Sequence, residues 1–353
     1  MVRRIAILLC TVWACVAASA AQAGPTLVFD ANTGNVLHAE QALAPWFPAS
    51  LTKLMTAYLV FGAIRDGRLN PGTKMICSAE AHSQPPSKLG LPIGGTISVD
   101  LALKLLIVKS ANDIAVMFAE AVSGSVDDFV AEMNATALKL GMTSTHFVNP
   151  HGLPGPGQVT TARDIGLLAR ALLRDFPEHA GLFSLERVKV GKSTLRSHNK
   201  LLGQFAGADG MKTGYICASG YNVVASATRG ERRVIAVVLG GRSGKERNDT
   251  ASDLLQRGFE EAWWKSILPK KLEDLSPSQE YGLRPEHMGP VVCKQRYRNG
   301  TDAYAVDARL YARSEARTIS QGDTVAASAS GTIPLIAAGP KAKAPIPTLR
   351  PEP

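Results

Sequence analysis

One long apolar segment of the sequence reads Pro48-Ala-Ser-Leu-Thr-Lys-Leu-Met-Thr-Ala-Tyr-Leu-Val-Phe61. It is predicted to form a helix, and its apolar side chains leave no wide polar face. A helix that is apolar all round lies in a protein core or in a membrane. This one is too short to cross a bilayer, which takes about 20 apolar residues. We therefore expect it in the core of a globular domain.

Two polar residues, Ser50 and Lys53, interrupt this stretch at its start. At positions i and i+3 they lie on the same side of the first turn, where the helix N–H groups place partial positive charge beside the serine oxygen. Apolar surroundings push a lysine amine towards its neutral form, and a hydroxyl beside such an amine is an activated nucleophile. The simpler alternatives are a helix-capping serine and a lysine whose amine reaches solvent.

A second Ser-x-x-Lys occurs at Ser197 and Lys200. The spacing alone is a weak signal, because a chain of this length should contain about one or two copies by chance. The second copy lies in a polar stretch, whereas the first opens an apolar helix. We therefore expect the nucleophile at Ser50.

Outward from this helix, the hydrophobic pattern indicates strands towards both ends and helices between them. Strands joined by turns are predicted within residues 25–40, 185–195 and 221–239. Helices are predicted over residues 101–106, 114–122, 126–140, 161–173 and 249–267, with Thr161 as a cap, and an irregular connection with short strands over 71–98. The pattern predicts an α+β fold with an antiparallel sheet packed on a helical cluster.

The N-terminus, residues 1–23, has the layout of a secretory signal peptide. It contains two arginines, an apolar run and the small-residue cleavage site Ala21-Gln-Ala23. The alternative is an uncleaved membrane anchor. We expect an exported protein of the periplasm.

The remaining chain is expected to contain three parts. A catalytic domain is predicted over residues 24–267 and a small C-terminal region over 268–332, with strands at 291–297 and 304–311. Residues 333–353 are rich in proline and are predicted to form a disordered tail.

The 353 residues carry a formal net charge of +9, with the basic residues scattered along the chain. This distribution favours a solvated basic surface over nucleic-acid binding. It is compatible with an acidic cell-wall polymer, or with weak peripheral contact with the inner membrane. The Pro-rich end lacks the apolar stripe of an amphipathic anchoring helix.

After the predicted cleavage site the chain keeps three cysteines, Cys77, Cys217 and Cys293. An odd and widely spaced set is no disulfide framework, although one pair is compatible with it. No cysteine or histidine spacing indicates a metal site, so we expect neither a metal nor another cofactor.

Two further motifs carry polar side chains suited to a cleft. The first, Ser110-Ala-Asn112, lies in a break between two predicted helices, where its alternative role is a helix cap. The second, Gly210-Met-Lys-Thr-Gly214, is predicted just before strand residues. Its glycine would let a substrate backbone approach closely, and its alternative role is a turn with the lysine in solvent.

Ser-x-x-Lys, Ser-x-Asn and Lys-Thr-Gly in this order are typical of penicillin-binding proteins and β-lactamases. Over residues 24–265 the chain resembles the D-alanyl-D-alanine carboxypeptidases, the low-molecular-mass penicillin-binding proteins. Asn149-Pro-His-Gly-Leu153, the stretch from Phe129 to Phe147 and Gly220-Tyr-Asn-Val-Val are also similar to that family.

The resemblance implies a serine acyl-transfer reaction on peptidoglycan stem peptides that end in two D-alanines. Ser50 would attack the carbonyl between them, with Lys53 as the base. Ser110 would pass a proton to the leaving amine, and Asn112 would hold the acylated backbone. The backbone N–H groups of Ser50 and Tyr215 would form an oxyanion hole.

The resemblance also implies a carboxylate site. Lys212 and Thr213 of the third motif, which ends at Gly214, would bind the terminal carboxylate or the acid group of a β-lactam, a covalent inhibitor. Arg247 matches a family arginine that reaches the same group, and a guanidinium suits this forked contact. Its alternative is a surface charge in a loop.

Three alternatives remain open on the same scaffold. A D,D-endopeptidase is close in chemistry. A β-lactamase is disfavoured because no Glu-x-x-Leu-Asn run lies between the second and third motifs. A catalytically silent cell-wall-binding protein is disfavoured because all the motif residues are present.

Overall fold

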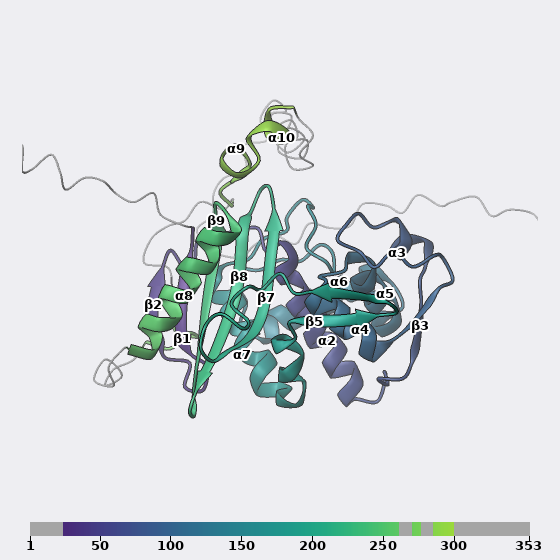
Figure 1. The fold of residues 1–353 in the computed structure, drawn as a ribbon, viewed down its shortest axis with the longest axis horizontal. Coiled ribbons are helices and arrows are strands. Elements are labelled where there is room, and N and C mark those ends of the chain that lie inside the picture. The colour runs from purple at the N-terminus through teal and green to yellow at the C-terminus, as the bar shows by residue number, and fades with distance from the viewer. Residues whose placement is uncertain (1–23, 261–269, 277–284, 300–353) are drawn as a thin grey trace, which may run out of the picture. The chain divides into compact units, whose positions relative to one another are not determined.

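The computed structural model describes residues 24–260, 270–276 and 285–299, which all belong to the first of two compact units, Met1–Tyr311. The expected leader, the Pro-rich tail and the expected strand at 304–311 lie outside the described residues. The expected α+β architecture is confirmed, with a main antiparallel sheet and a cluster of helices (Figure 1).

The main sheet has five strands in the order β2-β1-β9-β8-β7. Their bounds are β1 Thr26–Asp30, β2 Val36–Glu40, β7 Ala208–Ile216, β8 Gly220–Arg229 and β9 Arg232–Gly241. The N-terminal hairpin joins C-terminal strands, because Phe29 of β1 pairs with Ile235 of β9. The hairpins predicted within residues 25–40 and 221–239 are thereby confirmed.

The helices of the first half gather beside the sheet, around the predicted core helix. A short 3₁₀ helix, η1 Ala49–Thr52, leads into α2 Lys53–Arg65. The others are α3 Ala79–Ser83, α4 Val99–Val108, α5 Asn112–Ser123, α6 Val126–Lys139, α7 Ala162–Asp175 and η2 Pro177–Ser184. Two small hairpins accompany them, β3 Lys74–Ile76 with β4 Thr96–Ser98 and β5 Arg187–Val190 with β6 Ser193–Arg196.

The sheet is buried on both faces because its side chains alternate between two cores. Phe29, Val224 and Ile235 belong to the core shared with the helical cluster. The other face packs on α8, Gly244–Glu260, where Val223 and Val234 share a core with residues of that helix. Figure 1 shows α8 across the sheet strands, apart from the helical cluster. Leu51, Leu54 and Met55 are buried in the core shared with the helical cluster, which confirms the core position of the predicted central helix.

Some boundaries differ from the sequence-based expectation. The last helix begins at Gly244 rather than Asp249, because the Ser243 hydroxyl accepts from the Glu246 N–H at 3.1 Å and caps its first turn. The predicted cap of α7 is confirmed, since the Thr161 side chain accepts from the Asp164 N–H. Arg247 therefore lies in a helix and not in a loop.

The strand predicted at 291–297 is wrong. This segment forms two short helices, α9 Gly289–Val292 and α10 Lys294–Arg298. Pro290 in the first turn of α9 favours a helix start, which the apolar residues alone did not indicate. A helix also replaces part of the irregular connection predicted over 71–98.

Among the described residues, Cys217 and Cys293 form a disulfide, while Cys77 is buried and free. Among the described residues no helix is long and apolar enough to cross a membrane. The same residues contain no group of three or more His, Cys, Asp or Glu side chains placed to hold a metal ion.

Candidate active site

The Ser50 and Lys53 side chains meet at the start of the central helix, as predicted. Ser50 lies in η1, and Lys53 begins α2. The Lys53 Nζ atom lies 3.2 Å from Ser50 Oγ. Ala49 holds the preceding backbone at a φ of 47°, an uncommon conformation for a residue with a side chain. Such strain is characteristic of functional sites.

The Lys53 amine is fully buried and has two further neighbours. It donates to Asn112 Oδ1 at 2.7 Å and to the His151 carbonyl oxygen at 2.6 Å. Both neighbours can only accept, whereas the Ser50 hydroxyl can donate. An ammonium could donate to all three oxygens, whereas a neutral amine would give its two N–H bonds to the two carbonyl oxygens and direct its lone pair at the Ser50 hydroxyl. The geometry therefore accommodates the neutral form.

Electrostatics favour the same protonation state. Burial and then the positive charge of Lys212 lower the pKa of Lys53 well below its ordinary value, and Asp113 opposes this only in part. The arrangement therefore leaves Lys53 able to accept a proton from Ser50 at a pH well below the ordinary lysine pKa.

Two loops hold the partners of Lys53 in place. Asn112, which is the first residue of α5, donates through its amide to the Pro85 carbonyl at 2.9 Å, which assigns its oxygen to Lys53. The His151 Nδ1 atom accepts from the Leu153 N–H at 3.1 Å. Burial and the nearby Lys53 lower the pKa of His151 to about 3, so this ring is neutral.

No role for His151 followed from the sequence. The resemblance of residues Asn149 to Leu153 to the family was the sequence feature that pointed to this loop. The contact with Lys53 is made by a backbone carbonyl, which no side-chain pattern reveals.

Ser110 and Lys212 form a second pair. The Lys212 Nζ atom donates to Ser110 Oγ and to the Thr213 carbonyl, both at 2.9 Å. Ser110 has a φ of 60°, again uncommon for a non-glycine residue. Burial and the positive charge of Arg247 lower the pKa of Lys212 to about 7. The third motif lies within β7 rather than before a strand, because this strand pairs along its length with the apolar β8.

Gly214 brings β7 against the serine. A Cβ atom at this position would lie 3.1 Å from the Pro48 carbonyl oxygen and 3.2 Å from the Ser50 nitrogen. The close approach that the sequence suggested for a substrate is thus made by the protein's own backbone. Gly152, at a φ of 85°, leaves even less room, since its Cβ would lie 1.8 Å from the Ala49 oxygen.

A cleft of about 920 Å³ opens over these groups. The predicted site residues in its lining are Ser50, Ser110, Asn112, Thr213, Gly214, Tyr215 and Arg247. Lys53 and Lys212 are buried behind this lining. The structure thus brings all nine predicted site residues to one place.

Arg247 is 5 % exposed and belongs to the cleft, so it is no surface charge. Its Nη2 atom donates to Asn248 Oδ1 at 2.8 Å. Burial lowers its pKa to about 10, so it stays cationic at neutral pH. Burial and the neighbouring cation Lys212 also lower the pKa of His198, which lines the cleft. The cleft therefore takes its positive charge from Arg247 rather than from His198, and it suits an anionic ligand.

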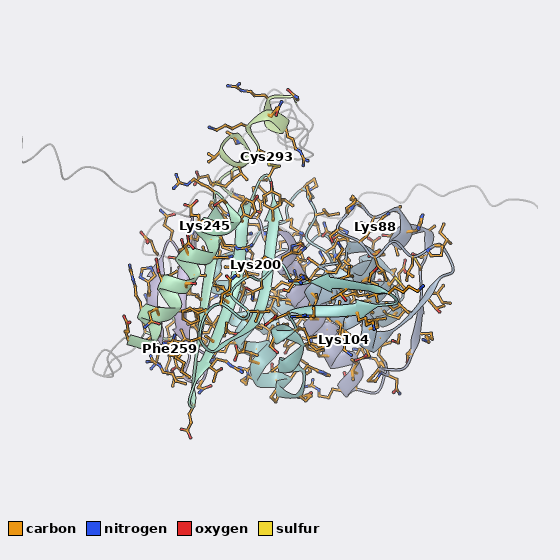
Figure 2. The ribbon with its side chains drawn as sticks, viewed as in Figure 1. Lys88, Lys104, Lys200, Lys245, Phe259 and Cys293 are labelled. Carbon is orange, nitrogen blue, oxygen red and sulfur yellow. A yellow bond between two sulfur atoms is a disulfide. The ribbon has the colours of Figure 1, made fainter. Side chains whose placement is uncertain are left out.

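The second Ser-x-x-Lys has another environment. Lys200 is exposed on the loop after β6 (Figure 2), and Ser197 Oγ accepts from the Asn199 N–H at 3.1 Å. No hydrogen bond joins Ser197 to Lys200 in the described part of the chain, although Lys200 reaches the edge of the cleft.

Comparison with known proteins agrees with this geometry. The family model of D-alanyl-D-alanine carboxypeptidases (peptidase S11) matches residues 14–243. The chain is 38% identical over 246 residues to the D-alanyl-D-alanine carboxypeptidase DacD of Salmonella typhimurium, covering 68% of this chain and 63% of the relative. The matched region thus spans less than two thirds of that relative.

Solved structures show the same fold. Penicillin-binding protein 5 from Haemophilus influenzae superposes with a TM-score of 0.65 and 35% identity, covering 67% of this chain and 71% of that one. The ampicillin-bound penicillin-binding protein D2 from Listeria monocytogenes gives 0.60 and 34%, covering 67% and 97%. The chain belongs to the D-alanyl-D-alanine carboxypeptidase family, peptidase S11.

Proposed function

We propose that the protein is a serine-type D-Ala-D-Ala carboxypeptidase that removes the terminal D-alanine from peptidoglycan stem peptides. The observation that carries this proposal is the fully buried Lys53 amine, which lies 3.2 Å from Ser50 Oγ and has two carbonyl oxygens placed to accept its N–H bonds. Membership of the family supports the substrate class.

In the proposed first step, Ser50 Oγ forms a bond to the carbonyl carbon between the two D-alanines. Its proton passes to Lys53, which becomes an ammonium. The carbonyl oxygen takes up negative charge, and the N–H groups of Ser50 and Tyr215 stabilise it. The tight packing of Gly214 against the Ser50 nitrogen supports this role, because it fixes the relative position of the two backbones.

In the second step, the bond to the terminal D-alanine breaks. The Lys53 ammonium gives its proton through Ser110 to the leaving amine, so Lys53 becomes neutral again. Lys212 polarises the Ser110 hydroxyl through their hydrogen bond. The products are D-alanine and an ester on Ser50. Water then adds to this ester, gives its proton to Lys53 and releases the shortened peptide as Ser50 regains its proton.

Charge and hydrogen bonding position the substrate in this proposal. Thr213 and Arg247 bind the terminal carboxylate at the cleft surface. Lys212, which is buried behind them, contributes positive charge to the same site when it is protonated, and a bound carboxylate favours that form. Asn112 binds the acyl part of the backbone with its amide group. No cofactor takes part in these steps.

β-Lactams would acylate Ser50 by the same first step, with their acid group in the carboxylate site. The ampicillin-bound Listeria relative supports this part of the proposal. We infer that the protein acts on the cell wall after export, in the periplasm, where a weak peripheral contact with the inner membrane is compatible with its basic charge.

The test is release of D-alanine from a short acyl-D-Ala-D-Ala peptide, with Ser50→Ala as the control. The wild type should release D-alanine and the variant should not. Equal release by both would leave only a cell-wall-binding role. Rapid turnover of penicillin would indicate a β-lactamase, and cleavage of cross-linked dimers without D-alanine release would indicate an endopeptidase.

A further inference from the structure

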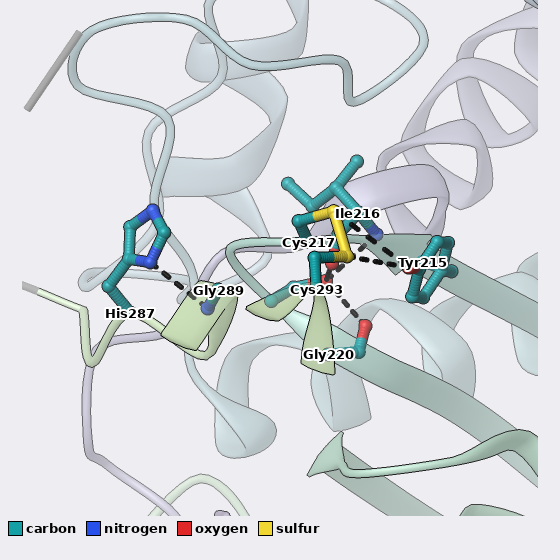
Figure 3. Close-up of a disulfide and its surroundings, with 8 residues drawn as sticks. Tyr215, Ile216, Cys217, Gly220, His287, Gly289 and Cys293 are labelled. Atoms are coloured by element: carbon teal, nitrogen blue, oxygen red, sulfur yellow. Dashed lines mark hydrogen bonds between the residues drawn. A yellow bond between two sulfur atoms is a disulfide. The ribbon is translucent and has the colours of Figure 1, made fainter. Parts of the chain in front are cut away.

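A disulfide attaches a distant segment to the strand that carries the third motif. Cys217 follows Gly214 by three residues, and its partner Cys293 lies between α9 and α10 (Figure 3). The attached segment also packs beside the turn after β7, where the Met288 N–H donates to the Ala218 carbonyl at 2.9 Å. The disulfide therefore anchors this segment at the end of the cleft strand.

The disulfide contacts a side chain of the cleft. The Tyr215 hydroxyl lies 3.1 Å from Cys293 Sγ and 3.9 Å from Cys217 Sγ. Sulfurs joined in a disulfide have no hydrogen, so the tyrosine must donate. Figure 3 shows the tyrosine hydroxyl directed at the disulfide. The other side of the ring packs on Tyr221, with 4.3 Å between ring centroids.

The Tyr215 ring is thus held from two sides, while 40% of the residue stays exposed and lines the cleft. Thr213 and Tyr215 are two residues apart on one strand, so their side chains share a face. In the proposed function Thr213 binds the carboxylate, and the Tyr215 N–H donates to the oxygen of the reacting carbonyl. The part of a ligand on the acyl side of that carbonyl would then reach the ring.

We propose that the Tyr215 ring is a specificity-determining surface for an apolar or aromatic substituent on the acyl side of the ligand, and that the Cys217–Cys293 disulfide positions this ring. The inference rests on the proposed function, because it takes the direction of the ligand from it. Tyr215 touches the ligand. The disulfide acts through Tyr215 and touches no reacting atom.

The experiment compares two penicillins. Benzylpenicillin has an aromatic acyl side chain, and the bare penicillin nucleus lacks it but keeps the reactive ring and the acid group. The measured quantity is the ratio of their acylation rate constants at Ser50, followed by mass spectrometry. Tyr215→Ala should lower the preference for benzylpenicillin by roughly 2–10-fold, which corresponds to one aromatic contact.

The double variant Cys217→Ala/Cys293→Ala should lower the same ratio in the same direction. Adding Tyr215→Ala to it should cause less than the sum of the two separate losses, because both changes act on the same contact between the ring and the ligand. Cys77→Ala, which keeps the disulfide, is the matched control and should leave the ratio unchanged. Tyr215→Phe tests the hydroxyl while keeping both the ring and the disulfide, and should give a smaller fall than Tyr215→Ala.

An unchanged ratio in Tyr215→Ala would overturn the inference, as would additive losses in the triple variant. Thermal unfolding of each variant identifies any general loss of folding, and Tyr215→Phe stays informative if the cysteine variants fail to fold. Failure of the wild type to form an adduct at Ser50 would instead contradict the proposed function. The two failures are therefore distinguishable.

Discussion

Ser50 and Ser197 are each followed by a lysine three residues later, yet the two pairs differ in almost every physical property. Lys53 is buried and lies 3.2 Å from its serine. Lys200 is exposed, and Ser197 is used to accept a backbone N–H. The Ser-x-x-Lys spacing can therefore support proton transfer only where the surroundings remove water from the amine and supply acceptors for its N–H groups.

Removing each serine in turn should give the largest difference between the two pairs. Ser50→Ala should abolish the penicillin adduct, because no other group would attack the ring, whereas Ser197→Ala should label like the wild type. Mass spectrometry of the digested, penicillin-treated protein locates the adduct. An adduct on Ser197, or labelling retained in Ser50→Ala, would contradict the assignment.

Removing each lysine should give the next largest difference. Lys53→Met should lower the acylation rate constant by about 10²–10⁴-fold, the usual contribution of a positioned base. Lys200→Met should change it less than about twofold, because an exposed charge at the cleft edge is screened by solvent. Stopped-flow acylation by a fluorescent penicillin measures both. Comparable losses in the two variants would remove the distinction between the pairs.

The pH dependence of the reaction tests whether the Lys53 pKa is lowered. Since Lys53 must be neutral to accept the proton, kcat for D-alanine release should fall tenfold per pH unit below the Lys53 pKa and level off above it. That pKa is well below the ordinary lysine value, so the plateau should begin far below pH 10. Saturating peptide keeps binding from limiting the rate. A rate that still climbs tenfold per unit above pH 9 would indicate an ordinary lysine.

The smallest expected effect concerns stability. Lys212 has a pKa of about 7 when folded and 10.5 as its ordinary value, so between these values the unfolded chain binds a proton that the folded protein does not. The free energy of unfolding should therefore rise with pH in this window, by up to about 1.4 kcal/mol per unit from this group. Lys212→Met should lose this part of the slope, and Lys200→Met should keep it. Urea unfolding at pH 7.5 and 9 measures the difference, and equal slopes in both variants would argue against a buried neutral Lys212.

Much of this arrangement could be predicted from residue patterns. The apolar residues on all sides of the central helix predicted that it is buried, and the i, i+3 spacing predicted the approach of Ser50 to Lys53. The strand periodicity predicted the hairpins of the main sheet. Each of these depends on local geometry, which repeats regularly along a chain.

Contacts set by tertiary packing were not predictable in this way. The His151 carbonyl reaches Lys53 through a loop far along the chain. The partner of Cys217 could not be identified among the cysteines. The approach of Gly214 to Ser50 requires knowledge of which element faces β7. The start of α8 is a different case, because Ser243 and Glu246 form a capping pattern in the sequence. The helical periodicity alone did not locate this start.

The position of β1 has a consequence for how the protein acquires its site. This strand pairs with β9 about 200 residues later, and the whole helical cluster lies between them in the chain. Contacts so distant in sequence form slowly, because a long loop must close before they stabilise anything. The sheet that brings Lys212 to Ser110 therefore waits for nearly the entire domain to be available. A chain still being synthesised has Ser50 and Lys53 but not the strand beside them, so the candidate site arises only as folding ends.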